Sequence, residues 1–592
     1  MTNLTRSMHT FFLPAFMLLA FSCEGSGWAQ TPLLVLASST GSQAAQGTSD
    51  PWWKHAVIYE IYPRSFQDST GDGIGDLRGI TQRLDYLQSL GVDAIWLSPI
   101  YPSPQVDFGY DISDYENVDP QYGTLADFDE LVAEAKKRNI RIIMDMVMNH
   151  TSDKHPWFVE SRSSRTNPKR DWYIWRDGKG PGIPPNNWES VFGHSAWKFD
   201  PTTNQWYYHK FYPEQPDLNW RNPEVEKAMF DSVRFWLDRG VAGFRLDAIP
   251  TLFEDPQLRD EKEVGGTNAY GDPNLDDSYT DNLPEVHDVM RRLRKMVASY
   301  PGDRVLIGET YLPNIQELDK WYGGSRHDEL NLPMDMQIGF ANKLDVNLFR
   351  QRIEEVETKV HGNQPLVVFD NHDNARSWNR YGDGVHDDAI ARLIATMLFT
   401  TRATALMYYG QELGMVTTTP TRKEEVKDPI GVIGWPNEKG RDGERTPMQW
   451  NASKDAGFST AASTWLPIPP DYTTVNVKAE EADPKSLLNW YKKLIELRRT
   501  NPALRDGALH MLDPTNPNVL SYLRKGPAGS PSVVVSLNFT AQPQTVSLDL
   551  AGTGVISNHI KTLMTDDASL QSTTSLTNIV LPPFASWVAS VQ

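Results

Sequence analysis

The 592 residues include a single cysteine, Cys23, so no disulfide can form within the chain. Basic residues are also in the minority: 57 Lys and Arg stand against 76 Asp and Glu, for a formal charge of -19. The few short basic stretches are balanced by acids nearby, which argues against a phosphate-binding surface of the kind that binds nucleic acid. The fold must therefore be held by its apolar core, with or without a metal ion, and the partner is expected to be neutral or cationic.

Long apolar runs are scarce, and the first one lies at the N-terminus. Residues 11–21 are apolar and follow a weakly basic start around Arg6 and His9, but they are too few to span a bilayer as a stable anchor. We interpret them as an export signal cleaved after Ala29, with lipoprotein processing at Cys23 as the alternative, and residues 30–50 as a disordered leader. The sequence thus predicts a periplasmic or secreted protein without a transmembrane segment in its mature chain.

From residue 56 onward, short apolar runs alternate with stretches of helical periodicity, such as those starting at 125 and 225. Eight runs have the length of buried parallel strands: AVIYEIYP near 56, DAIWLSP near 93, IRIIMDMV near 140, GVAGFRLD near 240, RVLIGE near 304, ELNLPMDM near 329, PLVVFDNHD near 365 and ATALMYYGQE near 403. Strand and helix repeated eight times predict an α/β fold, the (β/α)8 TIM barrel.

Two regions break this alternation. A polar, aromatic and Pro-rich stretch follows the third run and is too long for an ordinary loop, so we expect an inserted subdomain there. After about 505, short β-rich runs replace the helical pattern and predict a C-terminal all-β sandwich domain. The expected boundaries are 1–29 for the signal peptide, 30–50 for the leader, 51–151 and 221–504 for the two parts of the barrel, 152–220 for the insertion and 505–592 for the C-terminal domain.

Acidic residues end four of the eight runs, at Asp145, Asp247, Glu309 and Asp373. In a barrel these ends meet at one mouth, where burial and neighbouring charges tune the pKa of a carboxyl. A single acid could as well cap the next helix. Four together, with Arg245 on the same strand face as Asp247, indicate a catalytic site instead.

Glycoside hydrolysis requires such a set, because one carboxylate attacks or stabilises the anomeric carbon while another carboxyl protonates the leaving oxygen. Asp247, beside Arg245, is expected to stay ionised as the nucleophile. Glu309, in an apolar strand after Gly308, is expected to keep its proton and act first as acid and then as base.

At these residues the sequence resembles the α-amylase superfamily of glycoside hydrolases, in its α-glucosidase and oligo-1,6-glucosidase branch. The four signature segments are DMVMNH at 145–150, GFRLDAIP at 243–250, IGET at 307–310 and FDNHDN at 369–374. The resemblance implies Asp247 as nucleophile, Glu309 as acid/base and Asp373 as the third carboxylate that steadies the distorted sugar. It further implies sugar contacts from Arg245, His150 and His372, with Asp145 as structural support.

Further matches concern the glucose pocket. In VDFGYDISDY the resemblance implies that Tyr110 stacks under the terminal glucose and that Asp107 binds its hydroxyls. Arg445, in RTPMQW, is expected to pair with Asp107 and close the pocket, which favours exo action. QPDLNW at 215–220 is similar to a signature of the oligo-1,6-glucosidase type, and Phe192 is expected at the pocket entrance.

The resemblance implies a retaining α-glucosidase that hydrolyses maltose and short oligosaccharides. Ala248, directly after the proposed nucleophile, is typical of relatives that prefer α-1,4 bonds. The same segment, with NLPEVHD at 282–288, is also similar to trehalose synthases. A glucosyl transferase of the trehalose synthase or sucrose isomerase kind is therefore an alternative, because water and a sugar hydroxyl compete for the same intermediate. An inactive binding barrel is a further alternative, although the whole catalytic set is present.

One loop suggests a metal site. DSTGDGIGDL at 68–77 spaces oxygen ligands around glycines much as a calcium loop does, and predicts structural Ca2+. The side chains of Asp68, Thr70, Asp72 and Asp76 and the carbonyl of Ile74 are the expected ligands. The alternative is a Gly-rich turn with solvated acids. We expect no organic cofactor, an oligosaccharide as the small-molecule partner, and a monomer or homodimer.

Overall fold

The computed structural model describes residues 50–557 and 559–592. The predicted export signal, Cys23 and all of the predicted leader except Asp50 lie outside these residues. Within the described part, no helix has the length and apolarity needed to cross a membrane. The fold below is that of Pro51–Gln592, which forms one compact unit.

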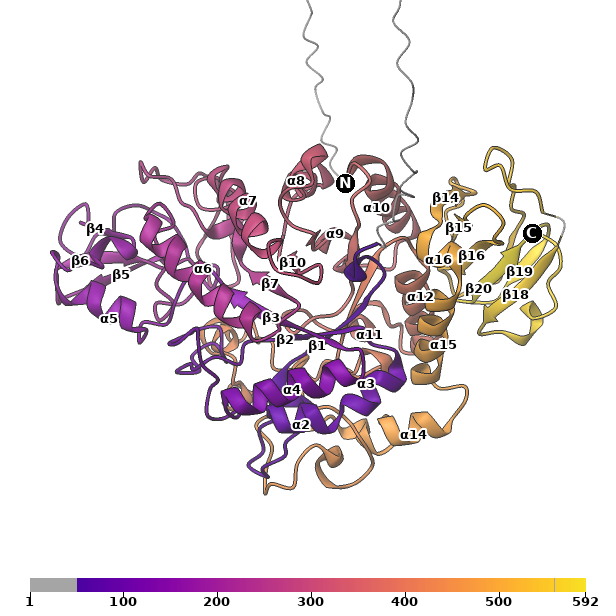
Figure 1. Cartoon of the computed structure of the whole chain (residues 1–592), viewed down its shortest axis with the longest axis horizontal. Coiled ribbons are helices and arrows are strands. Elements are labelled where there is room, and N and C mark those ends of the chain that lie inside the picture. The colour runs from indigo at the N-terminus through magenta and orange to yellow at the C-terminus, as the bar shows by residue number, and fades with distance from the viewer. Residues whose placement is uncertain (1–49, 558) are drawn as a thin grey trace, which may run out of the picture. The chain divides into compact units, whose positions relative to one another are not determined.

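A parallel eight-stranded sheet forms the centre of this unit, in the order β11-β10-β7-β3-β2-β1-β13-β12 (Figure 1). Its two edge strands meet through a single bridge between Met334 and Leu366, which closes the barrel. Each of the eight predicted runs contributes one strand, so the predicted barrel is confirmed. The strands are β1 (Val57–Ile61), β2 (Ala94–Leu97), β3 (Arg141–Val147), β7 (Gly243–Asp247), β10 (Val305–Gly308), β11 (Leu332–Pro333), β12 (Leu366–Val368) and β13 (Thr404–Tyr408).

Helices surround the strands with apolar side chains turned inward, and many of them begin at a side-chain cap. In α4, for example, Thr124 and Asp127 form a reciprocal capping box, while Phe128 and Leu131 are buried against the barrel. The helices are α1 (Pro63–Phe66), α2 (Leu77–Gln82), α3 (Leu84–Leu90), α4 (Leu125–Lys137), α6 (Pro223–Asp238), α7 (Glu285–Val297), α8 (Ile315–Trp321), α9 (Met336–Gly339), α10 (Val346–Lys359), α11 (Ser377–Tyr381), α12 (Asp387–Thr400), α13 (Pro429–Gly434), α14 (Val477–Ala482), α15 (Leu487–Thr500) and α16 (Pro502–Asp506).

Two excursions leave the barrel. Between β3 and α6 lie helix α5 (Pro156–Ser163) and a small sheet in the order β4-β6-β5, within the stretch where the long insertion was expected. Its strands are β4 (Trp175–Arg176), β5 (Trp197–Asp200) and β6 (Gln205–Tyr208). A second excursion, which the sequence did not reveal, follows β7 and contains the hairpin of β8 (Glu263–Thr267) and β9 (Pro273–Leu275).

Antiparallel sheets form the C-terminal part, next to α12 and α16 (Figure 1). A five-stranded sheet in the order β14-β15-β16-β20-β18 is accompanied by the pair β17-β19. Arg524 of β15 is fully buried and donates to the carbonyl of Thr400 at the end of α12, which ties this sheet to the barrel. The strands are β14 (Ala508–Leu512), β15 (Val519–Lys525), β16 (Ser532–Asn538), β17 (Gln544–Val546), β18 (Ile560–Thr565), β19 (Ile579–Leu581) and β20 (Ser586–Val591).

Candidate active site

The carboxylates that end the predicted strands gather at one barrel mouth. Asp247 is the last residue of β7, Glu309 directly follows β10 and Asp373 follows β12. All three line one cavity of about 610 Å³, a size typical of small-molecule sites. Asp145, inside β3, is 1% exposed and lies behind the cavity wall. The strand ends therefore bring three predicted carboxylates to one cavity, because parallel neighbours end at the same edge.

Arg245 lies among these acids and contacts three of them. Its guanidinium is fully buried, and Nη1 donates to Asp247 Oδ1 at 2.6 Å and to Asp145 Oδ1 at 3.2 Å. Nη2 lies 2.8 Å from Glu309 Oε1, which makes an ion pair, although the direction of its N–H groups does not meet the geometry of a hydrogen bond. One buried cation thus balances part of the charge of three carboxylates, which limits the cost of burying them.

Burial dominates the acidity of the two central carboxyls. It raises the pKa of Asp247 to about 7 and that of Glu309 to about 7, while the Arg245 charge acts against the rise at both. The expected contrast, in which Arg245 favours ionisation at Asp247 alone, is therefore not seen. The reason is that the guanidinium contacts both carboxyls, so their proton affinities are coupled.

Glu309 is oriented by the backbone that directly follows the neighbouring strand β7. Its Oε2 accepts a hydrogen bond from the N–H of Ala248 at 2.9 Å. Ala248 adopts φ 47 and ψ 33, a left-handed conformation that is uncommon for residues other than glycine. Strained backbone often marks functional sites, and here it turns an N–H toward the carboxyl.

Asp373 is held by two arginines. Its Oδ1 accepts from Arg441 Nη1 and from Arg445 Nη2, both at 2.8 Å. Although burial acts to raise it, the neighbouring His372 and the charged Arg441 and Arg445 hold the pKa of Asp373 well below its usual range. Asp373 is therefore a permanent anion in the cavity wall, unlike Asp247 and Glu309.

The predicted ion pair between Asp107 and Arg445 is wrong. Asp107 Oδ1 pairs with Arg441 Nη2 at 2.8 Å, and Arg445 instead donates to the carbonyl of His372 at 2.7 Å and to Asp373. Arg441 also contacts Asp428, so one guanidinium joins three carboxylates at one end of the cavity. Arg441 and Arg445 stand four residues apart in one segment, and spacing alone does not decide which of them reaches Asp107.

The predicted aromatic and histidine contacts divide between the wall and the layer behind it. Tyr110 and His150 line the cavity, whereas His372 is fully buried behind Tyr110. The rings of Tyr110 and His372 stack at 5.3 Å, and the Tyr110 hydroxyl lies 2.6 Å from Nε2 of His372. Burial lowers the pKa of His150 to about 3, so this histidine is neutral. Gln215, in the QPDLNW segment, bridges His150 and Asp107 at 3.1 and 3.2 Å.

Glu60 is a site residue that the sequence did not reveal. It lies in β1, is fully unexposed, and its Oε1 is 2.5 Å from Nδ1 of His372. Burial, together with the charges of Asp373 and Asp145, raises its pKa well above the usual range. A carboxyl inside an otherwise apolar strand was the available signal, since such a group is buried only with a partner.

Phe192 lines the cavity, as expected for a residue at its entrance, and stacks on Tyr212 at 4.3 Å. Ile430 of α13 completes this small apolar cluster. Other lining residues escaped the sequence analysis because they lie in irregular segments or in the second excursion: Tyr311, Glu189, Lys210, Thr251, Asn274, Leu275, Asp277 and Asp281.

In the glycine-rich loop at residues 68–77, the carboxylates accept hydrogen bonds mainly from backbone N–H groups close to them in the sequence. Asp68 accepts from the N–H groups of Thr70, Gly71 and Gly73 and from the Ser459 hydroxyl, and Asp76 caps α2 through Gly79. Asp72 accepts from the N–H of Ile74, whose carbonyl was the expected backbone ligand. Among the described residues, these three carboxylates do not form a group with ligand atoms within 4.8 Å of one another. The donor set thus fits a capped turn better than a metal cage, and bound Ca2+ stays a prediction.

Comparison with known proteins agrees with this arrangement. The model of the α-amylase catalytic domain matches residues 60–507. A probable α-glucosidase of Rhizobium meliloti (strain 1021) is 43% identical over 514 residues, covering 84% of this chain and 91% of the relative. An oligo-1,6-glucosidase of Parageobacillus thermoglucosidasius is 41% identical over 519 residues, covering 83% and 90%. The crystal structure of the trehalulose synthase MutB of Pseudomonas mesoacidophila MX-45 superposes with a TM-score of 0.83 at 36% identity, covering 92% of this chain and all of the other.

Proposed function

The chain belongs to the α-amylase family and is a glycoside hydrolase, and we propose that it is a retaining, exo-acting α-glucosidase. The observation that carries this proposal is the ion-pair network in the cavity wall. Arg441 links Asp107 to Asp373 there, in the same wall as the two central carboxyls. We infer that this network closes the cavity at one end, so that it accepts a terminal glucose and stops a longer chain from passing through.

The proposed reaction uses Asp247 and Glu309 in turn. Asp247 attacks the anomeric carbon while Glu309 gives its proton to the glycosidic oxygen, so that the C–O bond breaks and a glucosyl ester on Asp247 forms. Glu309 then takes a proton from water, which attacks the same carbon; the ester bond to Asp247 breaks, the carboxylate is restored and glucose leaves with its α configuration. The shared contact with Arg245 and the raised pKa of both groups support this assignment, because one proton on the pair is the state that the reaction needs.

We further propose a preference for α-1,4 bonds, as in maltose and short maltooligosaccharides. Ala248 lines the cavity next to Asp247, and its small side chain leaves room beside the scissile bond. Export through residues 1–29 and structural Ca2+ at residues 68–76 also remain proposals, supported by the sequence patterns alone.

Transfer of glucose to a sugar hydroxyl is the second candidate. The likeness to a trehalulose synthase favours it, because the same covalent intermediate serves hydrolysis and transfer. The cavity is large enough for an acceptor beside the glucose pocket. Hydrolysis and transfer differ in whether water or a second sugar occupies the space beside the glucose pocket when the covalent intermediate forms.

Product analysis tests both candidates. We expect maltose to give glucose as the main product, and the first glucose released, followed by NMR, to be the α anomer. Isomaltose, sucrose and trehalose should be cleaved more slowly. Trehalose or isomerised disaccharides as main products would establish transfer, and β-glucose as the first product would contradict a retaining mechanism.

A further inference from the structure

A second hollow lies at the opposite mouth of the barrel. It measures about 180 Å³ and is bordered by the start of β1 at Val57, by Asp93 before β2 and by Arg141 at the start of β3. Helices α15 and α16 complete it with Arg498, Arg499, Arg505 and Ile495. The catalytic carboxyls stand at the other ends of these strands, so this hollow is separate from the active site.

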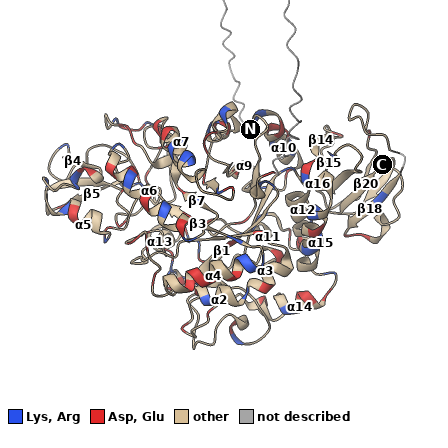
Figure 2. Cartoon of the chain, in the orientation of Figure 1, with Lys and Arg blue, Asp and Glu red and all other residues tan. Residues whose placement is uncertain are grey.

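Its lining is strongly cationic. Four arginines border it, and Asp93 is the single acid in the lining. The chain as a whole carries a formal charge of -19, and acidic and basic residues are mixed along outer helices such as α4 and α6 (Figure 2). The arginines that directly follow those two helices are paired with acids, Arg138 with Asp85 and Arg239 with Asp129. A cluster of four arginines around one small hollow therefore departs from the charge pattern of the rest of the surface.

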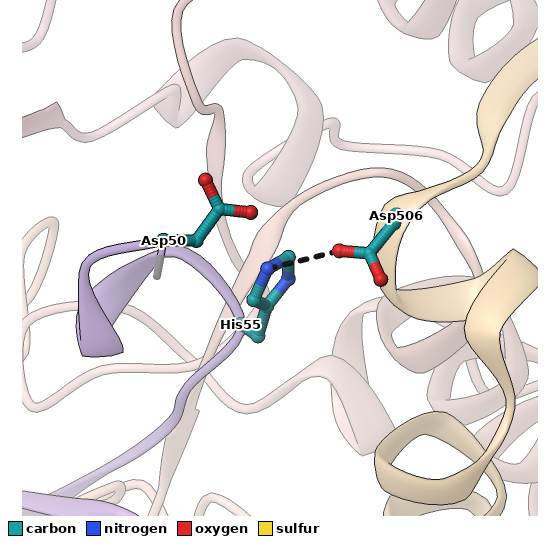
Figure 3. A group of neighbouring side chains, drawn as sticks. All are labelled: Asp50, His55 and Asp506. Atoms are coloured by element: carbon teal, nitrogen blue, oxygen red, sulfur yellow. Dashed lines mark ion pairs between the residues drawn. The ribbon is translucent and has the colours of Figure 1, made fainter. Parts of the chain in front are cut away.

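Pairing within the hollow leaves most of this charge uncompensated. Arg499 lies 3.6 Å from Asp93, whose other oxygen accepts from the N–H of Val57. Arg141 stacks on the ring of Trp52 at 4.6 Å, and neither it nor Arg505 forms an ion pair with any described residue. His55 at the edge is paired with Asp506 of α16 at 3.2 Å, so this acid is already engaged (Figure 3).

Arg498 forms the buried floor of the hollow. It is 3% exposed, and its Nη groups donate to the carbonyls of Phe399, Thr401 and Ala403, which fixes the guanidinium in place. Its Nε has no hydrogen-bond partner among the described residues. A buried donor without a partner is costly, so the folded chain alone does not satisfy all the donors of this guanidinium group.

We propose that this hollow binds a tetrahedral oxyanion, namely phosphate or the phosphate group of a small monoester. Guanidinium groups are the preferred partners of phosphate oxygens, and several of them converge here. At about 180 Å³ the hollow is smaller than a typical small-molecule site, which suits a single oxyanion better than a nucleotide. The bound anion ties the α15–α16 corner to the starts of β1 and β3 and stabilises the fold without entering the reaction.

The first test is the apparent melting temperature of the whole chain, titrated with sodium phosphate at constant ionic strength, with chloride as the replaced salt. A specific site gives a rise that begins near Kd and then grows only with the logarithm of the phosphate concentration, because the stabilisation follows RT ln(1 + [L]/Kd). General salting-out by phosphate or sulfate gives a rise in proportion to concentration. A parallel titration with glycerol phosphate shows whether the site takes the free ion or a monoester, and a rise in proportion to concentration with both, or no rise with either, overturns the proposal.

The second test removes the exposed arginines. Arg141→Gln combined with Arg505→Gln should reduce the phosphate-induced rise several-fold and leave kcat for maltose unchanged. The matched control is Arg234→Gln, an exposed arginine of α6 that pairs with Asp231, and it should keep the full rise. If the double variant and the control respond equally to phosphate, the hollow is not the site. If the double variant folds poorly, titration calorimetry with phosphate replaces this test. It compares the unmodified chain with Arg505→Lys, which keeps the charge.

Discussion

The barrel mouth and the loop at residues 68–76 are both rich in carboxylates, but the fold uses these carboxylates in different ways. At the mouth, Asp145, Asp247 and Glu309 come from three neighbouring strands and meet around one buried guanidinium. In the loop, Asp68 and Asp76 accept hydrogen bonds from the backbone of their own segment. Acids that end parallel strands are gathered by topology, whereas acids inside a turn are available to the turn itself. Chemistry is therefore expected from the first group and local stability from the second.

The largest difference between the two groups should appear on neutralising one carboxylate in each. Asp247→Asn is expected to lower kcat by about 10⁴-fold or more, because it removes the attacking group. It should also abolish the glucosyl adduct that an activated fluorosugar forms, as measured by intact-protein mass spectrometry. Asp72→Asn, an exposed acid of the loop, is the matched control and should keep nearly full activity. Adduct formation by Asp247→Asn would remove this residue from its role.

Glu309→Gln should separate substrates by their leaving groups. Maltose needs a proton on the departing oxygen, so its kcat should fall by about 10²- to 10⁴-fold. An activated aryl glucoside leaves without that proton, and its bond cleavage should be much less affected. Steady-state kinetics on both substrates measures the contrast, and an equal loss on both would mean that Glu309 does not act as the acid.

Arg441→Gln tests whether the ion-pair network of Arg441 closes the cavity, as proposed. The change leaves Asp107 and Asp428 buried without their cation, at a cost of about 3–5 kcal/mol for breaking a buried pair. We expect kcat/KM for maltose to fall by at least about 10²-fold, mainly through weaker binding of glucose. Arg441→Lys restores charge without the fork-shaped contact and should recover part of the loss. Unchanged maltose kinetics in Arg441→Gln, in a protein with a normal melting curve, would remove it from the glucose pocket.

The pH dependence of activity should reflect the coupled titration of Asp247 and Glu309. Activity needs Asp247 ionised and Glu309 protonated, so it rises as the first proton leaves and falls as the second leaves. Because burial raises the pKa of both groups to about 7, the alkaline limb should lie near neutrality rather than near 4.5, where an ordinary glutamate titrates. In Glu309→Gln the alkaline limb should vanish with an aryl substrate. An unchanged limb would assign it to another group.

The loop should show the smallest effects, and on stability alone. The Ser459 hydroxyl and the loop N–H groups lower the pKa of Asp68, against the effect of its burial. A depressed pKa in the folded state contributes stability at neutral pH that is lost as the pH falls through the native pKa. Asp68→Asn should therefore cost about 1–3 kcal/mol at neutral pH and less in acid, as measured by denaturant melts.

Calcium is tested separately in the same loop. If the loop binds Ca2+, a chelator lowers the melting temperature of the parent chain and leaves that of Asp68→Asn unchanged. An identical melting temperature with and without chelator would contradict the calcium prediction and leave the capped turn as the complete account.

Much of the fold could be predicted because it depends on local patterns. The eight buried strands are continuous apolar runs, and the acids at their ends were predicted to meet because the barrel has only one mouth for carboxyl ends. The hairpin of β8 and β9 was missed because its residues are exposed or half-buried and glycine-rich, so no apolar periodicity marks it. Its contribution to the cavity, through Asn274 and Leu275, was missed with it.

The site was predicted less completely than the fold, for a physical reason. Spacing shows which residues can share a strand face, but it does not show how side chains from irregular segments pair. Arg441 and Arg445 offered the same chemistry, and only the path of the chain between α13 and the cavity brings Arg441 to Asp107. Glu60 carried a signal, a lone acid in an apolar strand, but its partner His372 is 312 residues away.

The closure of the barrel has a consequence for motion. Among the described residues, β11 has two residues and reaches β12 through one bridge, between Met334 and Leu366, while the other neighbouring strands pair along two to five positions. Amide protons at this junction should exchange with solvent sooner than those of β3 or β7, because fewer hydrogen bonds must open together. Glu309 and Asp373 lie on opposite sides of that junction. A transient opening there would change the width of the cavity between Glu309 and Asp373 before it disturbed Asp247.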